Sequence, residues 1–319
     1  MKQETKDYID LELLVNQKLH EHNLVPRISQ VRLYPHHSVI INGKQFSHHI
    51  VSCTHCQKRF FLKILKEDDN SLLCDRFLQE ISIKESEVPY PQVVVPKFTF
   101  HGMQYYITTY IEGQSLDTFS DALPRTTWNN VADKLLILID QIASLTAEQY
   151  SEHGTFVPDN YASIMKEKFE IRRKHPLIAC YSNAKLERLF NWFCDVLDHS
   201  QFSKPTLIHM DIKPANIIYN NNTGFVALID FEFARFGDID YGWTQILMSK
   251  LNHFNQFYKE HIVPRLISEK ITWDDALNTP KLQCYLFYQA MCNLIYYHDR
   301  NLPCPKEFRE LFSFFINRT

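Results

Sequence analysis

Three polar side chains that could bind a metal ion and a hydroxyl group follow two short apolar runs in the middle of the chain. Residues 206–208 lead into Asp211 and Asn216, and residues 226–229 lead into Asp230. Apolar runs of this length, bounded by turn residues, are typical of buried strands. A carboxylate can orient a hydroxyl and accept its proton, whereas Mg²⁺ prefers oxygen ligands such as amides and carboxylates. This combination predicts phosphoryl transfer, which depends on positioning and charge neutralisation.

Each of these side chains has an expected role in that chemistry. Asp211 would position the attacking hydroxyl, and Asn216 and Asp230 would hold Mg²⁺. Lys213 either contacts the γ-phosphate or is a solvated loop lysine, and both interpretations stay open. Asp and Asn are also common in turns for reasons of backbone conformation. Several matching positions in one strand-loop-strand context nevertheless favour a site.

The same stretch resembles the catalytic core of kinases. His-x-Asp-x-x-x-x-Asn at residues 209–216, followed by Ile-Asp-Phe at residues 229–231, looks most like the aminoglycoside phosphotransferase and choline kinase superfamily. The resemblance implies a two-lobed protein kinase-like α+β fold, with a sheet-rich N-terminal lobe and a mainly helical C-terminal lobe. It places a nucleotide-binding lobe in residues 1–111 and a catalytic and substrate-binding lobe in residues 112–319. One departure is Gly242, which stands where an aspartate is common.

Lys63 lies inside an apolar strand pattern, Phe-Phe-Leu-Lys-Ile-Leu. Because burial of an unpaired ammonium group is costly, this lysine either has a partner or points outward from the sheet. In kinases a lysine at this place contacts the α and β phosphates and pairs with a helix glutamate. Glu80, in a predicted helix over residues 72–84, is the expected partner, with Glu85 and Glu87 as rivals.

Two further stretches are expected to contact the nucleotide. The turn pair Asn42-Gly43 precedes Ser47, whose hydroxyl and main-chain N–H could bind phosphate in a loop near this turn. Only one glycine is present there, so a plain turn is the alternative. The resemblance also implies a hinge at which the main chain of Tyr110, Ile111 and Glu112 binds the adenine. The same residues would serve equally well as a simple exit from a strand.

The rest of the chain must supply the elements that position these groups. An N-terminal helix is predicted over residues 6–22, and short strands are predicted between residues 27 and 111. Beyond them the apolar spacing is helical. The predicted helices span residues 128–150, 161–174, 185–199, 243–261, 272–278, 280–298 and 306–316.

Composition narrows the possible functions. The chain has 319 residues, of which 45% are hydrophobic, and a formal net charge of −3. This is enough to bury the core of about two lobes, and it does not indicate non-specific nucleic-acid binding. Charges throughout the first 21 residues argue against a secretory signal, and no apolar run approaches the roughly 20 residues of a membrane helix. A cytoplasmic protein without a membrane partner is therefore expected.

Eight cysteines are scattered through the sequence. In a chain of this character they are expected to be reduced thiols. Cys53 and Cys56 form the one close pair, and His48, His49 and His55 lie nearby. A metal site there stays an alternative, although no second Cys-x-x-Cys follows and structural zinc needs four ligands.

The reaction predicted from these features is transfer of the γ-phosphate of ATP, with GTP not excluded, to a hydroxyl of a small molecule in the presence of Mg²⁺. The acceptor could be an antibiotic or a metabolite such as choline, an amino alcohol or a sugar. Residues 243–319 contain nine Lys or Arg and seven Asp or Glu, so they offer no carboxylate excess for a polycationic aminoglycoside.

Two other functions compete with this prediction. A protein kinase is suggested by His-x-Asp-x-Lys-Pro-x-x-Asn, but residues 230–243 leave no room for the usual activation segment. A non-catalytic nucleotide-binding module would be expected to lack Asp211 or Asp230, and both are present.

Overall fold

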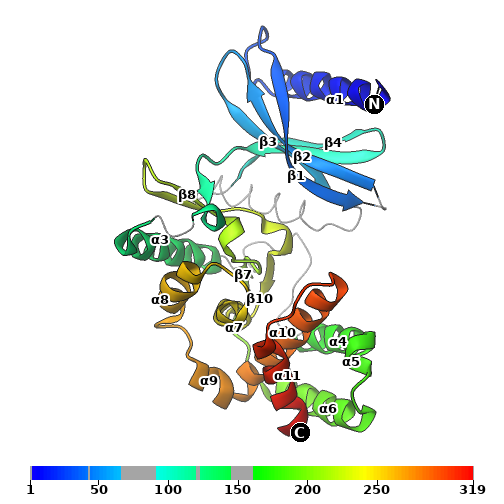
Figure 1. Cartoon of the computed structure of the whole chain (residues 1–319), viewed down its shortest axis with the longest axis vertical. Helices are drawn as coiled ribbons and strands as arrows, with labels where there is room; N and C mark the ends of the chain where they lie inside the picture. The colour runs from blue at the N-terminus through cyan, green and yellow to red at the C-terminus, as the bar shows by residue number, and fades with distance from the viewer. Residues whose placement is uncertain (1, 42–43, 66–90, 120–122, 145–160, 319) are drawn as a thin grey trace. The chain divides into compact units, whose positions relative to one another are not determined.

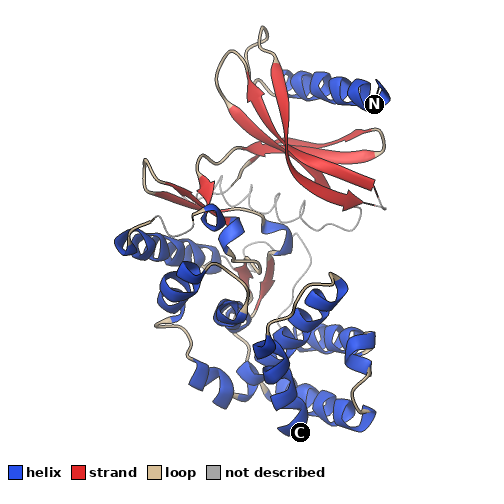
Figure 2. Cartoon of the chain, in the orientation of Figure 1, coloured by secondary structure: helices blue, strands red, loops and turns tan. Residues whose placement is uncertain are grey.

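The computed structural model describes residues 2–41, 44–65, 91–119, 123–144 and 161–318 (Figure 1). The chain divides into two compact units. The first comprises Met1–Gly113 and Ile229–Phe233, and the second comprises Gln114–Leu228 and Ala234–Thr319. The predicted α+β class is confirmed, because the first unit carries an antiparallel sheet of five strands and the second is mainly helical (Figure 2).

The first unit is built on one sheet with the strand order β1-β2-β3-β5-β4. Its strands are β1 (Val31–Ile41), β2 (Lys44–Cys53), β3 (Arg59–Leu65), β4 (Val93–Phe100) and β5 (Met103–Thr109). The strands β2 and β3 pair as an antiparallel hairpin, with Ser52 opposite Arg59. The pair Asn42-Gly43 and the predicted helix over residues 72–84 lie outside the described residues.

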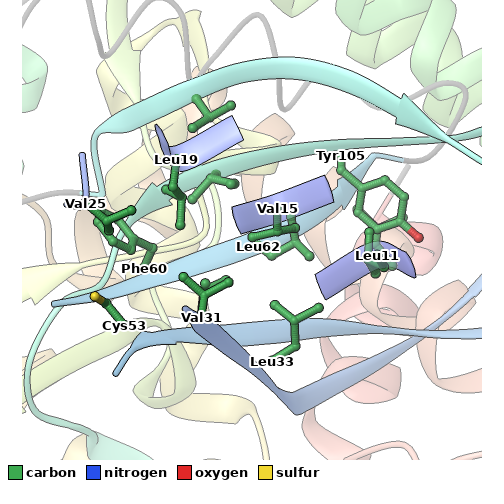
Figure 3. Packing of buried hydrophobic residues seen from close by; sticks show 14 residues of the cluster. Leu11, Val15, Leu19, Val25, Val31, Leu33, Cys53, Phe60, Leu62 and Tyr105 are labelled. Carbon is green, nitrogen blue, oxygen red and sulfur yellow. The ribbon is translucent and has the colours of Figure 1, made fainter. Parts of the chain in front are cut away.

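The helix α1 (Lys2–Glu21) packs on this sheet. Leu11, Val15 and Leu19 recur every four residues, so they share one helix face. All three are buried in a cluster with sheet residues that include Leu62 (Figure 3). Burial of each such side chain contributes about 1.5–3 kcal/mol, which explains why this charged helix is held on the sheet.

The second unit has two small sheets among its helices. One pairs β7 (Thr206–Ile208) with β10 (Arg235–Gly237), and the other has the order β6-β8-β9. Its strands are β6 (Gln114–Ser115), β8 (Ile217–Asn220) and β9 (Phe225–Leu228). The predicted strand-loop-hairpin pattern around residue 211 is thus confirmed, because β7 precedes the loop and β8 and β9 form the hairpin.

Many helices of the second unit pack around α10 (Pro280–Asp299), most of which is buried. Phe287 of α10 stacks on Phe312 and contacts Phe169, so aromatic side chains form part of this core. The longer helices are α3 (Arg125–Ala143), α4 (Tyr161–Arg173), α6 (Asn183–His199), α7 (Ile239–Met248) and α11 (Lys306–Arg318). The shorter ones are η1 (Leu116–Thr118), α5 (Pro176–Ala179), η4 (Pro214–Asn216), η6 (Ser249–Leu251), α8 (Val263–Ile267) and α9 (Trp273–Asn278). None of the helices in the described residues combines the length and apolar character needed to cross a membrane.

The single helix predicted over residues 243–261 is wrong. The helix α7 ends at Met248, Asn252 is extended, and helical structure resumes as a π-helix, η7 (Tyr258–Ile262). Asn255 lies in the break, where its side chain accepts from the Phe257 N–H at 2.8 Å and donates to the Phe119 carbonyl at 3.1 Å. Asn side chains compete with a helix for main-chain partners in this way, whereas apolar periodicity alone does not detect the competition.

Candidate active site

The loop after β7 holds the side chain of Asp211 in place. Oδ2 of Asp211 accepts hydrogen bonds from Nζ of Lys213 at 2.6 Å and from Nδ2 of Asn216 at 2.8 Å. The same Nδ2 also donates to the main-chain carbonyl of Asp211 at 2.9 Å. Three residues predicted for the site from sequence are therefore brought together within one unit.

The backbone of this loop is strained immediately before Asp211. Met210 has φ +66°, in the left-handed region, which costs a residue with a side chain roughly 1–3 kcal/mol and persists only where the surroundings enforce it. Gln245 of α7 donates a hydrogen bond to the Met210 carbonyl. Tyr258 of η7 donates to the Ile212 carbonyl at 3.0 Å. Side chains from two helical segments thus hold the carbonyls on either side of Asp211.

Gln245 and Tyr258 were not identified from sequence as positioning residues. Both lie in a stretch where the apolar spacing predicts a core helix. The sequence does not show that their polar groups bond to carbonyls of the Asp211 loop, because this depends on tertiary packing. Tyr258 is fully buried, and burial together with the charge of Asp211 raises the pKa of its hydroxyl. The hydroxyl is therefore protonated at neutral pH and acts as a hydrogen-bond donor.

A second buried carboxylate fixes the start of α7. Asp238 is the N-cap of this helix and accepts from the Asp240 N–H at 3.2 Å. It also accepts from Lys281 and from Tyr285, each at 2.9 Å. The position of α7, and with it that of Gln245, is thereby tied to α10.

The close packing of α7 on β7 explains why residue 242 is a glycine rather than the aspartate that is common in the family. A Cβ atom at this position would lie 2.7 Å from Cγ2 of Ile208, closer than any real carbon contact. Ile208 belongs to β7, directly before the loop that carries Asp211. A larger residue at position 242 would therefore force α7 and β7 apart.

The first unit contributes a lysine and a carboxylate of its own. Nζ of Lys63 on β3 lies 3.9 Å from Oδ1 of Asp230, and 5.8 Å from the ring centre of Tyr106. Lys63 is largely buried, whereas Asp230 is one-third exposed. Asp230 has φ +64°, in the left-handed region that few residues other than glycine adopt. Glu80, the expected partner of Lys63, lies outside the described residues.

Two predicted nucleotide contacts can be located but stay predictions. Tyr110, Ile111 and Glu112 follow the end of β5 and belong to no strand or helix. Arg59 lies over the Tyr110 ring at 4.5 Å and donates from Nε to Glu112 at 2.9 Å. These side chains are thus engaged with each other, which agrees with a hinge that would use only its main chain.

The expectation that Ser47 lies in a loop is wrong. Ser47 is inside β2, opposite Ser38 of β1, because the two strands continue their pairing to Lys44 and Ile41. A β-branched and aromatic composition around this turn favours an extended hairpin over a long loop. Contact of Ser47 with phosphate stays a prediction.

The donor set fits Mg²⁺. Since Nδ2 of Asn216 is directed at two acceptor oxygens of Asp211, the atom of its amide that remains for a cation is Oδ1. Asp230 supplies a carboxylate, and hard ions of this kind take oxygen ligands. Asn216 and Asp230 belong to different units, and their joint binding of one ion stays a prediction.

The alternative metal site at Cys53 and Cys56 finds no support. Their sulfur atoms are 2.8 Å apart and hydrogen-bonded, and within the described ranges no histidine or carboxylate joins them as a third ligand. The described residues do contain one ligand-like cluster, formed by His175, His298 and Asp299. There His175 uses Nδ1 to accept the Leu177 N–H as the cap of α5, so its Nε2 donates to Asp299 at 2.9 Å.

The family of the chain follows from its sequence. Residues 39–249, more than half of the chain, match the model of the phosphotransferase enzyme family, and the chain belongs to this family. No curated protein matches the sequence.

Solved structures show the same fold. A GDP complex of wild-type aminoglycoside 2'-phosphotransferase-IIIa is 16% identical and superposes with a TM-score of 0.60, over 96% of this chain and 99% of that one. Aminoglycoside phosphotransferase APH(4)-Ia is 14% identical with a TM-score of 0.65, over 94% and 96% of the two chains. A ternary complex of a thermostable APH(4)-Ia mutant with AMP-PNP and hygromycin B has a TM-score of 0.63 at 16% identity, over 94% and 98%. The predicted kinase-like fold is thus confirmed.

Proposed function

We propose that the chain is a small-molecule kinase that transfers the γ-phosphoryl group of ATP, or of GTP, to a hydroxyl of its acceptor. The observation that carries the proposal is the carboxylate of Asp211, held by Asn216 and Lys213 in the loop after β7. Membership of the phosphotransferase enzyme family and the nucleotides named in the related structures support it.

In the proposed reaction, Asp211 orients the acceptor hydroxyl and takes up its proton. A bond forms between the acceptor oxygen and the γ-phosphorus, the bond from that phosphorus to the bridging oxygen breaks, and the nucleoside diphosphate leaves. Lys63 would neutralise charge on the phosphates that are not transferred, and Lys213 charge on the γ-phosphate. Mg²⁺, held by Asn216 and Asp230, would supply further charge neutralisation.

The acceptor is an alcohol, either an antibiotic or a metabolite of the choline, amino-alcohol or sugar type. The related enzymes carry names and ligands of aminoglycoside type, such as hygromycin B, at 14–16% identity. We place the reaction in the cytoplasm, in keeping with the seven described cysteines, all of which are free thiols.

The test is an acceptor screen with purified full-length chain, Mg²⁺, and ATP or GTP, in which release of nucleoside diphosphate is measured. Turnover with at least one alcohol, and its loss in the Asp211→Ala variant, is the expected result. Transfer of labelled phosphate to proteins but to no small molecule would instead identify a protein kinase.

A further inference from the structure

A group of cations in the second unit has no role in the reaction described above. Lys168 and Arg172 are four residues apart on α4, so their side chains share a face, and Arg235 lies on β10. The guanidinium of Arg172 lies 6.0 Å from the ring centre of Tyr288, and that of Arg235 lies 5.5 Å from the ring centre of Tyr241. The two rings are 6.3 Å apart. These contacts join Lys168, Arg172 and Arg235 into one region, which we call the cationic cluster.

Among the residues that the structure describes, no carboxylate forms an ion pair with any member of the cationic cluster. Other cations of the same helix do have such partners. Arg173 pairs with Glu187 at 2.6 Å, and Lys166 pairs with Asp198. The contrast on a single helix shows that the cluster differs from the ordinary solvated faces of this protein.

The polar groups that do surround the cluster leave its charge uncompensated. Burial is the main cause that lowers the pKa of Lys168 to about 8, and the positive charges of Arg235 and Arg172 contribute to the same shift. The exposed carboxylate of Glu167 raises this pKa, but its effect is the smallest of those that act on Lys168. Burial raises the pKa of the Cys292 thiol beside Arg172, so this thiol is neutral at pH 7.

The nearest buried carboxylate is already used elsewhere. Asp238 lies three residues after Arg235, but Lys281 and Tyr285 both donate to its Oδ2. Lys281 is also paired with Asp240 at 2.6 Å. These two carboxylates and this lysine carry one net negative charge, against the three positive charges of the cluster.

The cationic cluster adjoins the catalytic loop of the same unit. Arg235 is the register partner of Ile208, which lies three residues before Asp211. The guanidinium of Arg235 lies over the ring of Tyr241. Tyr241 is one helical turn before Gln245 on α7, and Gln245 donates a hydrogen bond to the Met210 carbonyl. The strand that carries Arg235 and the helix that carries Tyr241 are thus the elements that pack against the Asp211 loop.

Building on the proposed function, we propose that the cationic cluster binds an anionic group, a carboxylate or a phosphate, of the acceptor whose hydroxyl Asp211 positions. Guanidinium groups present paired N–H donors that match two oxygens of such an anion, and stacking on tyrosine rings orients them. The same charges repel a polycation. The acceptor class assigned in this way is a hydroxy acid or a phosphorylated alcohol.

Anion binding can be measured without any turnover. The melting temperature of the full-length chain is followed while sodium malonate or sodium phosphate replaces sodium chloride at constant ionic strength. Malonate tests for carboxylate and phosphate tests for phosphate. The wild type is expected to show a saturable rise with at least one of them, and the double variant Arg172→Gln/Arg235→Gln is expected to lose it. Arg173→Gln is the matched control, because it removes an arginine from the same helix but outside the cluster.

The double variant should fold, since it removes two like charges, and its melting temperature in chloride checks this. An equal response of the wild type and the double variant to both anions overturns the inference.

Kinetics then separate the inference from the proposed function. Gluconate, glucose 6-phosphate, glucose and glucosamine share a carbon skeleton and differ in charge, so they form a first panel of acceptors. With an anionic acceptor, the double variant should raise KM at least about tenfold. Turnover of a neutral or cationic acceptor with KM unchanged in the double variant overturns the inference and leaves the kinase assignment intact. Anion binding at the cluster without turnover of any alcohol contradicts the kinase assignment instead.

Discussion

Asn216 donates its side-chain amide to both the carboxylate and the main-chain carbonyl of Asp211, at 2.8 and 2.9 Å. A single residue thus sets the rotamer of the carboxylate and closes the loop that carries it. The arrangement also determines which end of the Asn216 amide is left for a cation. In the proposed mechanism, positioning of the hydroxyl and binding of the metal ion are therefore coupled through one side chain.

Replacement of Asp211 by Ala should lower kcat by a factor on the order of 10² or more, because the acceptor hydroxyl loses its base and its orientation. Nucleotide affinity should be nearly unchanged, since Asp211 has no assigned contact with it. Steady-state kinetics and a nucleotide titration measure the two effects. Turnover within a few-fold of the wild type would remove Asp211 from the mechanism.

Replacement of Lys63 by Ala should raise the KM for ATP, lower kcat, or both, because a largely buried cation next to Asp230 is lost. Replacement of Asp230 by Ala should abolish the Mg²⁺-dependent activity. An Mg²⁺ titration of both variants distinguishes them: excess Mg²⁺ should not restore Asp230→Ala. Restoration of that variant at high Mg²⁺ would contradict its role as a metal ligand.

Replacement of Tyr258 by Phe should slow the reaction by roughly tenfold and lower the free energy of unfolding by about 1–2 kcal/mol. The Ile212 carbonyl, one residue after Asp211, would lose its buried donor. Tyr297→Phe is the matched control, since it removes a hydroxyl that bonds to the Asn252 side chain at 3.0 Å. Equal losses of kcat in the two variants would show that Tyr258 acts only through general stability.

Replacement of Gly242 by Ala should destabilise the protein by about 1–3 kcal/mol, even though Ala favours a helix over Gly by about 1 kcal/mol. The cause is the contact of the new Cβ with Cγ2 of Ile208. Urea unfolding of Gly242→Ala, Ile208→Ala and the double variant measures the coupling. The loss should be smaller in the Ile208→Ala background; strict additivity would rule out this clash.

Lys168 should make stability rise with pH in the alkaline range. Its folded pKa is lowered from 10.5 to about 8, so below about pH 8 the lysine is charged in both states, and the cost of that charge in the folded state is fully present. Between about pH 8 and 10.5 the unfolded chain holds the proton that the folded protein has released, and stability increases. Urea unfolding of the wild type and Lys168→Met across this range tests this. As the pH rises, the free energy of unfolding of the wild type should increase relative to that of Lys168→Met. A difference that does not change with pH would contradict the prediction.

Local patterns in the sequence were sufficient for much of the fold. Apolar residues at a spacing of three to four identified α1 and most helices of the second unit to within a few residues, because burial of one helix face is a short-range requirement. The break after Met248 was missed, because it depends on Asn255 meeting the Phe119 carbonyl, more than a hundred residues earlier in the chain.

The types and spacing of Asp211, Lys213 and Asn216 were by themselves sufficient to predict the candidate loop, since residues so close in sequence can bond within a single turn. Only the tertiary structure decided which distant side chains hold that loop, and that Lys63 lies beside Asp230. It alone also brought Arg235 together with the face of α4 that carries Lys168 and Arg172. The physical reason is that such contacts depend on how strands and helices pack after the chain has closed, and no local period in the sequence records that packing.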